Sequence, residues 1–226
     1  MSRFVFIVLT VIIGCTACQK AELKKPVEVN FSLKMEQDNS AQGLKMSWGE
    51  ICLTKFDVIG DRAVGEDISF MRSFENGLIS DMNGSGEVVE LDYDLPQGEY
   101  ESVEIWAECQ SLNLSHSLML TGKYVDGSNS FNVRFETAES IDFLILGCNE
   151  DEVGPILFDK SMAKKVTVGF DVDYWFEEID EDMWEDADRI VEGNQVVILI
   201  NQSNNLEIYQ SVITRIPENV KAIFKN

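Results

Sequence analysis

Residues 27–36 read Val-Glu-Val-Asn-Phe-Ser-Leu-Lys-Met-Glu, and this stretch decides the class of fold. Apolar side chains occupy every second position from Val27 to Met35, and polar or charged side chains occupy the positions between them. A period of two is typical of a β-strand that packs one face on a core and turns the other toward solvent. The sequence therefore predicts that the folded part of the chain begins with a half-buried strand.

Seven further short runs, rich in β-branched and aromatic residues, follow this strand. They are 51–59, 68–74, 87–93, 100–109, 117–124, 130–136 and 141–147. Turn residues separate several of them, as in Asp126-Gly127-Ser128-Asn129. Because no amphipathic helix lies between the runs, we predict an all-β or mainly β fold, an antiparallel β-sandwich. Residues 27–226 form this domain, and two packed sub-domains that divide near 112–116 are the alternative.

The segment 174–191 interrupts the strand pattern near the C-terminus. It contains eight acidic residues and carries Trp175, Ile179, Met183 and Trp184 near helical spacing. Such a pattern predicts a short acidic helical segment or a pair of helical turns whose apolar side faces the core.

The same acidic segment contains the candidate calcium ligands, which are Asp180, Asp182 and Asp186. Carboxylate oxygens are the donors that calcium prefers, but a calcium-binding loop also needs a glycine at its sharp turn. The segment contains no glycine before Gly193. A solvated acidic face is therefore the alternative interpretation, and calcium is the one cofactor that the sequence suggests.

The N-terminal residues have the features of an export signal. Residues 4–14 are almost entirely apolar, follow Arg3 and lead into Cys15. An apolar stretch of about ten residues is typical of a signal peptide, whereas a membrane-spanning helix needs about 20. Ile12-Ile13-Gly14-Cys15 resembles the bacterial lipobox, in which the cysteine is lipidated and becomes the new N-terminus. Cys18 is the second choice.

This resemblance implies a lipoprotein of the bacterial cell envelope. We expect residues 1–14 to be the lipoprotein signal peptide and residues 15–26 to be a tether between lipid and domain. The lipid would anchor the protein to a membrane, for which we expect the outer membrane, with either a periplasmic or a surface face. Envelope proteins or glycans are the expected partners.

The charge of the chain excludes one class of partner. With 18 basic and 40 acidic side chains the formal net charge is −22 at pH 7. Nucleic-acid binding requires a basic patch that neutralises phosphates, and no run of basic residues supplies one. We therefore expect no nucleic-acid partner.

The cysteine and histidine residues predict no catalytic or zinc site. Cys109 and Cys148 each end an apolar run and are the predicted pair if a disulfide forms, with buried free thiols as the alternative. His116 is the single histidine, and we expect it to be structural. No nucleophile elbow, phosphate-binding glycine loop or zinc-protease helix is present in the sequence. We therefore predict a protein that is not an enzyme.

The four tryptophans raise the alternative of a sugar-binding surface. They are Trp48, Trp106, Trp175 and Trp184. Trp106 alternates with Val103, Ile105 and Ala107, so it points to the opposite face of its strand. Tryptophans more often belong to a core, because they bury a large apolar area.

Two stretches resemble a known family. They are Trp48-Gly49-Glu50-Ile51-Cys52-Leu53-Thr54-Lys55-Phe56-Asp57-Val58 and Leu95-Pro96-Gln97-Gly98-Glu99-Tyr100. Together they resemble the bacterial envelope lipoprotein domains of the domain-of-unknown-function family 4382, of the Bacteroidetes type. The resemblance covers about residues 45–110, implies a prealbumin-like sandwich and supplies no catalytic residues. In the second stretch, we expect Gly98 to take a positive φ in a turn that fixes the pairing of its flanking strands.

These observations lead to one expected function and two alternatives. The expected function is a non-enzymatic, lipid-anchored envelope protein whose β-sandwich is a binding or interaction module. The alternatives are a carbohydrate-binding or glycan-processing surface lipoprotein and a calcium-dependent adhesin.

Overall fold

The computed structural model describes residues 26–38, 43–84, 86–112, 114–151, 154–159 and 164–225. The predicted signal peptide and almost all of the tether, with Cys15 and Cys18, lie outside these residues. In the described ranges, none of the helices combines the length and the apolar character needed to cross a membrane.

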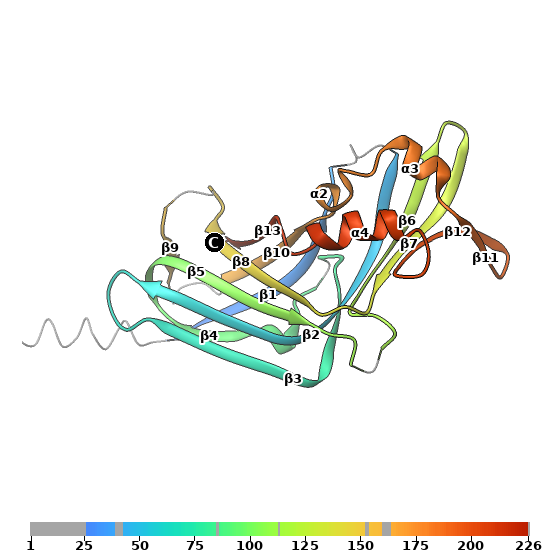
Figure 1. The fold of residues 1–226 in the computed structure, drawn as a ribbon. Coiled ribbons are helices and arrows are strands. Elements are labelled where there is room, and N and C mark those ends of the chain that lie inside the picture. The colour runs from blue at the N-terminus through green and yellow to red at the C-terminus, as the bar shows by residue number, and fades with distance from the viewer. Residues whose placement is uncertain are drawn as a thin grey trace, which may run out of the picture.

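Thirteen strands and three α-helices make up the described part of the chain (Figure 1). The strands are β1 (Pro26–Glu36), β2 (Leu44–Arg62), β3 (Ile68–Asp81), β4 (Tyr93–Pro96), β5 (Gly98–Cys109), β6 (Leu118–Asp126), β7 (Asn129–Thr137), β8 (Ile141–Asn149), β9 (Ile156–Phe158), β10 (Lys164–Asp171), β11 (Arg189–Glu192), β12 (Gln195–Ile200) and β13 (Val220–Lys225). The helices are α2 (Val172–Phe176), α3 (Glu181–Asp186) and α4 (Leu206–Arg215), and η1 (Val89–Leu91) is a single 3-10 turn. The fold is mainly β, as predicted.

The strands form one mixed sheet, which corrects the prediction of a purely antiparallel one. Its main order is β11-β12-β7-β6-β2-β5-β8-β13-β10-β1-β4, and β3 and β9 pair with β2 and β5. Three pairs of neighbouring strands run parallel, namely β1 with β10, β7 with β12 and β8 with β13. These partners are far apart in sequence, as Val29 opposite Lys164 illustrates. The turn at Asp126–Asn129 joins β6 and β7 as a hairpin, but short turns carry no information on such long-range pairs.

Strand β2 joins two regions of the molecule. Along one edge it pairs with β6 up to Ile51 and with β5 from Leu53 onward, and along its other edge it pairs with β3. The register shifts between Leu53 and Lys55, which is the sign of a β-bulge at the point where the partner changes. Strands β2 and β5 precede residues 112–116, and their partners β6 and β8 follow them. One sheet and one contiguous core therefore contain both halves of the chain.

In the first region, the curled region, the sheet bends so that β1 packs over β2. This region comprises β1, β3–β5, β8–β10, β13 and residues 53–62 of β2 (Figure 1). Phe31 of β1 contacts Phe56 of β2 edge to face, with ring centroids 5.2 Å apart. Phe224 of β13 lies on the other side of Phe31, at 6.3 Å. Tyr93 donates its hydroxyl hydrogen to the Phe56 carbonyl oxygen over 2.6 Å, so this aromatic core leaves its polar atom paired.

The chain turns a corner between Pro96 and Gly98. The prediction that this turn fixes the pairing of its flanking strands is wrong, because β4 pairs with β1 whereas β5 pairs with β2, β8 and β9. Gly98 takes the predicted positive φ, at 145°. Tyr100 donates its hydroxyl hydrogen to the Pro96 carbonyl oxygen over 2.7 Å, and burial raises the pKa of Tyr100 to about 12, which keeps that donor protonated.

The second region, the helix-covered region, consists of β6, β7, β11, β12, residues 44–51 of β2 and the three helices (Figure 1). Trp184 of α3 stacks on Tyr124 of β6 at 4.7 Å, and Tyr209 of α4 stacks on Phe135 of β7 at 5.7 Å. Phe176 of α2 contacts Phe135 edge to face. An aromatic layer therefore joins the helices to the sheet, and each ring pair contributes about 0.5–1.5 kcal/mol beyond area burial.

The acidic segment 174–191 contains parts of three elements rather than one continuous helix. Asp171 accepts a hydrogen bond from the Tyr174 amide and begins α2, and Asp180 accepts one from the Met183 amide and begins α3. Both carboxylates satisfy amide groups that a helix start leaves without partners. The chain then extends from Ala187 into β11.

Candidate functional site

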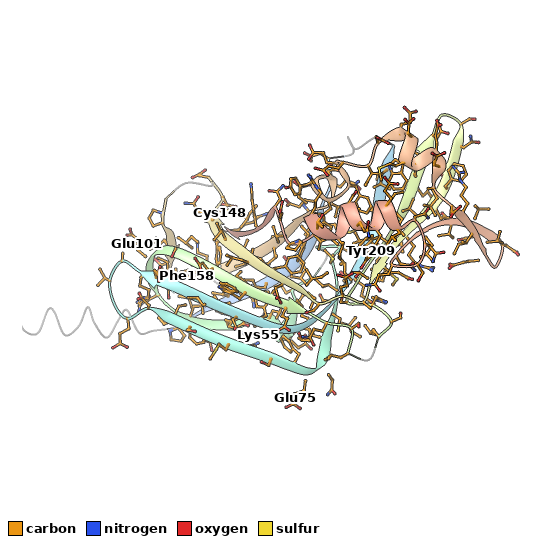
Figure 2. The ribbon with its side chains drawn as sticks, viewed as in Figure 1. Lys55, Glu75, Glu101, Cys148, Phe158 and Tyr209 are labelled. Atoms are coloured by element: carbon orange, nitrogen blue, oxygen red, sulfur yellow. The ribbon has the colours of Figure 1, made fainter. Side chains whose placement is uncertain are left out.

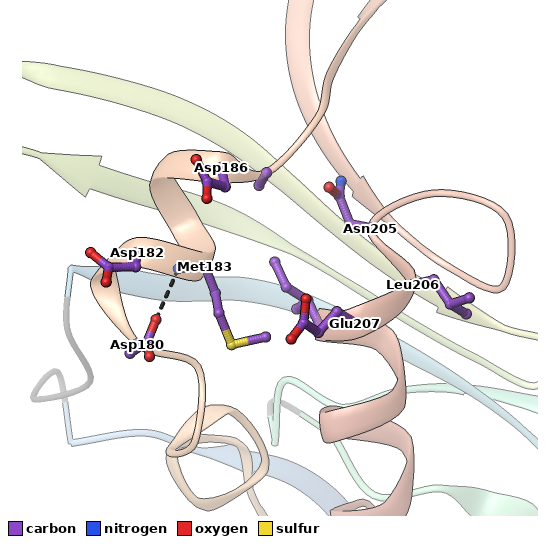
Figure 3. A pocket seen from close by; sticks show the side chains of 9 residues that line it. Asp180, Asp182, Met183, Asp186, Asn205, Leu206 and Glu207 are labelled. Carbon is purple, nitrogen blue, oxygen red and sulfur yellow. Dashed lines mark hydrogen bonds between the residues drawn. The ribbon is translucent and has the colours of Figure 1, made fainter.

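The structure brings the three predicted calcium ligands to one open cleft between α3 and the start of α4. The cleft has a volume of about 360 Å³ (Figure 3). Asp180, Asp182 and Asp186 line it from the α3 side, and Asn205 and Glu207 line it from the α4 side.

The carboxylates of this cleft do not converge on a common point. Asp180 already accepts the Met183 amide hydrogen over 2.9 Å, and Asp182 and Asp186 point in different directions from α3 (Figure 3). In the part of the chain that the structure describes, no group of three or more His, Cys, Asp or Glu residues is arranged to hold a metal ion. Calcium binding thus stays a prediction, with an acidic helix surface as the simpler description of the cleft.

The predicted disulfide between Cys109 and Cys148 does not form in the structure, because the two residues lie near opposite ends of β8. Cys109 lies opposite Ile141, at the start of β8, whereas Cys148 lies near the other end of that strand (Figure 2). Seven strand residues span about 23 Å, and a disulfide requires Cα atoms within about 7 Å. Burial raises the pKa of the Cys109 thiol well above its ordinary value, so this cysteine packs as an unreactive apolar side chain.

His116 links a loop to strand β2. Its Nε2 atom lies 2.9 Å from Glu50 Oε1, and its Nδ1 atom lies 3.1 Å from Ser115 Oγ. A serine, a histidine and a carboxylate in one hydrogen-bonded chain form the core of a hydrolytic triad, which also needs a substrate cleft and oxyanion donors. None of the three residues lines the cleft at α3 or the pocket between β1, β10 and β13 described below. The contacts of His116 hold residues 115–117 against β2.

The four tryptophans do not form a single platform. Trp175 and Trp184 are buried in the helix-covered region, and Trp48 is partly buried. Trp106 alone of the four is largely exposed, with 45% of its surface accessible. Its position follows the alternation in the sequence, which placed Trp106 on the face of β5 opposite to Val103, Ile105 and Ala107.

Trp106 belongs to a row of directly opposite residues that crosses four strands, and we call this part of the sheet the Trp106 face. In the strand register Met71 of β3 lies opposite Asp57 of β2, Asp57 lies opposite Trp106 of β5, and Trp106 lies opposite Leu144 of β8. Directly opposite residues share one face of a sheet. Met71 and Leu144 are exposed, as is Leu146 two residues further along β8. The Trp106 face thus presents four large apolar side chains to solvent.

Asp57 is the polar centre of the Trp106 face and only 4% exposed. One of its oxygens lies 2.8 Å from Lys55 Nζ, and Asp57 also accepts a hydrogen bond from the Arg72 amide. The hydrogen bond with Asp57 raises the pKa of Lys55, so Lys55 stays positively charged at neutral pH. Lys55 lies on the outer side of β2 (Figure 2).

Carboxylates surround the apolar part of the Trp106 face. Glu104 and Glu108 lie two residues before and after Trp106 on β5, and Asp142 lies opposite Glu108 on β8. A flat aromatic surface with hydrogen-bond acceptors at its rim can stack on the apolar side of a ligand and bind its polar groups. This arrangement is suited to binding a ligand.

Part of the Trp106 face was missed by sequence reasoning. In residues 141–147, Ile141, Phe143 and Ile145 are buried and alternate with Asp142, Leu144 and Leu146, so two large apolar residues stand at solvent-facing positions. That alternation was readable in the sequence. Met71 and Asp57 join Trp106 only through the pairing of β3, β2 and β5, which the sequence does not specify. Comparisons of the chain with protein-family models, with curated proteins and with solved structures find no match.

Proposed function

We propose that the chain is a non-enzymatic, lipid-anchored protein of the bacterial cell envelope whose β domain is a binding module that acts through the Trp106 face. The exposed row of Met71, Trp106 and Leu144 on one side of the sheet carries this proposal. Contiguous exposed apolar side chains mark interaction surfaces. Tryptophan is also among the residues that contribute most to binding energy at interfaces.

The anchor is proposed from the sequence. Residues 4–14 and the Ile12-Ile13-Gly14-Cys15 junction support lipidation of Cys15, with Cys18 as the second choice. Each buried methylene contributes about 0.8 kcal/mol of membrane affinity, and two or more acyl chains hold a protein stably. Outer-membrane placement belongs to the same proposal, with the periplasmic and surface faces both open.

The partner that fits the Trp106 face best is another envelope protein. Aliphatic side chains on both sides of Trp106 suit a flat apolar contact, and the buried Asp57 carboxylate, paired with the exposed Lys55 ammonium group, gives its centre a fixed polar group. A glycan is the alternative partner. It is favoured by the position of Trp106 between Glu104 and Glu108, which could accept hydrogen bonds from sugar hydroxyls beside a stacked ring.

The finer description of the module is proposed as well. A prealbumin-like sandwich, implied by the family resemblance, is supported by the packing of β1 over β2 through Phe31 and Phe56. The acidic helical segment near the C-terminus is supported by α2 and α3. A calcium-dependent adhesin would use Asp180, Asp182 and Asp186, and its support is their common cleft.

Capture of partners from envelope extract, run beside a glycan array, tests the proposed binding face. Trp106→Ala removes the central ring, and Val191→Ala, at an exposed apolar position on β11, is the matched control. A captured protein that is lost with Trp106→Ala and kept with Val191→Ala supports the leading proposal. A glycan signal with that dependence supports the alternative. If Trp106→Ala changes binding in neither assay, the assignment of the Trp106 face as the binding surface is overturned.

Metabolic labelling with an alkyne fatty acid tests the anchor separately. We expect Cys15→Ser to abolish the label and to release the protein from membranes or block its processing. Label that persists in Cys15→Ser but disappears in Cys18→Ser would show that the second cysteine carries the lipid.

A further inference from the structure

A second pocket opens on the outer side of β1, β10 and β13, and it shares no lining residue with the Trp106 face or the acidic cleft. Its volume is about 450 Å³. Asn30, Ser32, Thr167, Lys165 and Lys225 line it, and Gly84, Gly86 and Glu87 form its rim. We call this pocket the lysine groove.

The strand register brings two ammonium groups together in the lysine groove. Lys165 of β10 lies directly opposite Lys225 of β13, and Asn30 of β1 lies opposite Lys165 on its other side. Directly opposite residues on neighbouring strands point to the same face, and like charges in that position destabilise the sheet. The fold therefore maintains an unfavourable pair of cations at this pocket, in a chain whose net charge is −22.

The negative charge within the groove balances only part of this pair. Glu87 at the rim lies 3.2 Å from Lys165 Nζ, and both side chains are largely exposed, so the ion pair contributes little to stability. Lys225 forms no ion pair with any residue in the described ranges. Within the described residues, Lys225 thus has no ion-pair partner. Lys165 has a partner, Glu87, which a bound anion can replace.

A second opposed lysine pair shows what is special about the groove. Lys45 of β2 lies directly opposite Lys123 of β6, and both are exposed. These two lysines line neither the acidic cleft nor the lysine groove. Of these two pairs, Lys165 and Lys225 are the ones that line the lysine groove, beside the hydroxyl groups of Ser32 and Thr167.

We propose that the lysine groove binds a phosphate monoester, with the phosphate between Lys165 and Lys225 and the organic part along Ser32 and Thr167. A phosphate monoester carries a charge of about −1.5 to −2 at neutral pH, which balances two ammonium groups. Lysine is a common phosphate ligand, and each ammonium group donates up to three hydrogen bonds. The pocket falls within the size range of small-molecule sites and exceeds what phosphate alone would fill.

The ester belongs to a soluble molecule or to a lipid headgroup. The groove begins on β1 at Asn30, four residues after Pro26, so it lies close to the point where the chain from Cys15 enters the domain. Eleven extended residues span at most about 40 Å, which keeps the domain near any membrane to which Cys15 is anchored. The lipid source rests on the proposed anchor, whereas the chemistry of the groove does not.

Calorimetric titration of the full chain, with Cys15→Ser to prevent lipidation, tests the soluble source. The probes are glycerol 3-phosphate and inorganic phosphate. We expect saturable binding of the ester that weakens at least tenfold in the double variant Lys165→Gln with Lys225→Gln. The matched control, Lys45→Gln with Lys123→Gln, removes the same charge and should leave the affinity unchanged. Glu87→Gln removes the competing carboxylate and should tighten binding several-fold.

Vesicle sedimentation of the same unlipidated chain tests the lipid source. Phosphatidylcholine vesicles with and without phosphatidic acid are compared, and residues 1–25 are identical in every variant. Binding that gains from phosphatidic acid in the parent and the control pair, but not in the groove pair, assigns the ester to a lipid. Failure of both probes, equal losses in both lysine pairs, or inorganic phosphate binding as tightly as the ester would overturn the proposal. Each of these results is independent of Trp106 and of lipidation.

Discussion

Trp184 and Trp106 lie against neighbouring parts of one sheet and have opposite surroundings. Trp184 stacks on Tyr124 beneath the helices and is 1% exposed, whereas Trp106 stands on an uncovered part of the sheet. The difference arises because α2, α3 and α4 cover the side of the sheet that carries Tyr124 and Phe135. Whether an aromatic residue belongs to the core or to a binding surface is therefore decided here by segments far along the chain.

The largest expected effect comes from truncating each of these two tryptophans. Trp184→Ala removes a fully buried ring and should lower the free energy of unfolding by about 3–5 kcal/mol. Trp106→Ala should cost much less, about 1 kcal/mol, because 45% of the residue is already exposed to solvent. Chemical denaturation measures both. Similar losses in the two variants would mean that the Trp106 face is part of the core and would remove the basis of the proposed function.

Substitutions at two glycines compare the backbone of the curled region with that of the helix-covered region. Gly98 stands at the corner of the curled region with φ at 145°, a conformation that β-branched residues avoid, so Gly98→Val should cost about 1–3 kcal/mol. Gly127, in the hairpin of the helix-covered region, has φ at 55° and open space around an added Cβ. Gly127→Ala should therefore cost less, and equal denaturation midpoints for Gly98→Val and the parent would show that the corner is unconstrained.

Acid dependence is expected at the edge of the helix-covered region. Arg134 on β7 contacts both carboxylate oxygens of Glu192 on β11, at 2.6 and 2.7 Å, and this hydrogen bonding lowers the pKa of Glu192 below its ordinary value of 4.5. The unfolded state therefore binds more protons than the folded state between the two pKa values. The contribution of the pair is complete above pH 4.5 and is lost as the pH falls through the lowered pKa.

Denaturation of the parent and Glu192→Gln between pH 7 and pH 3 measures this dependence. The difference in stability between the two proteins should shrink on acidification. A difference that stays constant over the whole range would show that Glu192 stabilises the edge strand by packing and not by charge.

The smallest expected effect is that of calcium on the helix-covered region. Because its acidic cleft lacks converging carboxylates, 1 mM calcium should leave the melting temperature almost unchanged. For comparison, a site with a Kd of about 10 µM would add roughly 2.7 kcal/mol at a hundredfold excess of calcium. A rise of several degrees that magnesium does not reproduce, and that disappears in Asp180→Asn with Asp182→Asn, would favour the adhesin.

Local patterns in the sequence predicted much of the fold. Alternation identified β1 and β5 nearly residue by residue, since burial on one face leaves a period of two in a strand. The run 87–93 was misassigned as a strand, and it contains η1 and the start of β4. Residues 189–191 were included in the predicted helical segment but belong to β11, which pairs with β12, because tertiary pairing overrides helical spacing in so short a stretch.

The candidate sites also differ in how far local sequence patterns predicted them. The three aspartates of the acidic cleft are sequence neighbours on or beside α3, so the sequence was enough to group them. The outward direction of Trp106 also followed from alternation. Asp57 beside Trp106, and Lys165 opposite Lys225, depend on strand register, which is fixed by contacts between residues as many as 60 positions apart. Periodicity predicts which face of the sheet a side chain occupies, but it does not predict which residue lies beside it on the next strand.

The place of β1 in the sheet determines how the domain would respond to mechanical force. The chain from Cys15 enters the fold at Pro26, and β1 pairs with β10 from Val29 opposite Lys164 to Glu36 opposite Asp171. On its other side, its first residues pair with β4. Tension applied through Pro26 therefore acts along the strand and shears these hydrogen bonds together, instead of opening them one at a time. An anchor at this end would pull on the fold in the direction in which a sheet resists extension best.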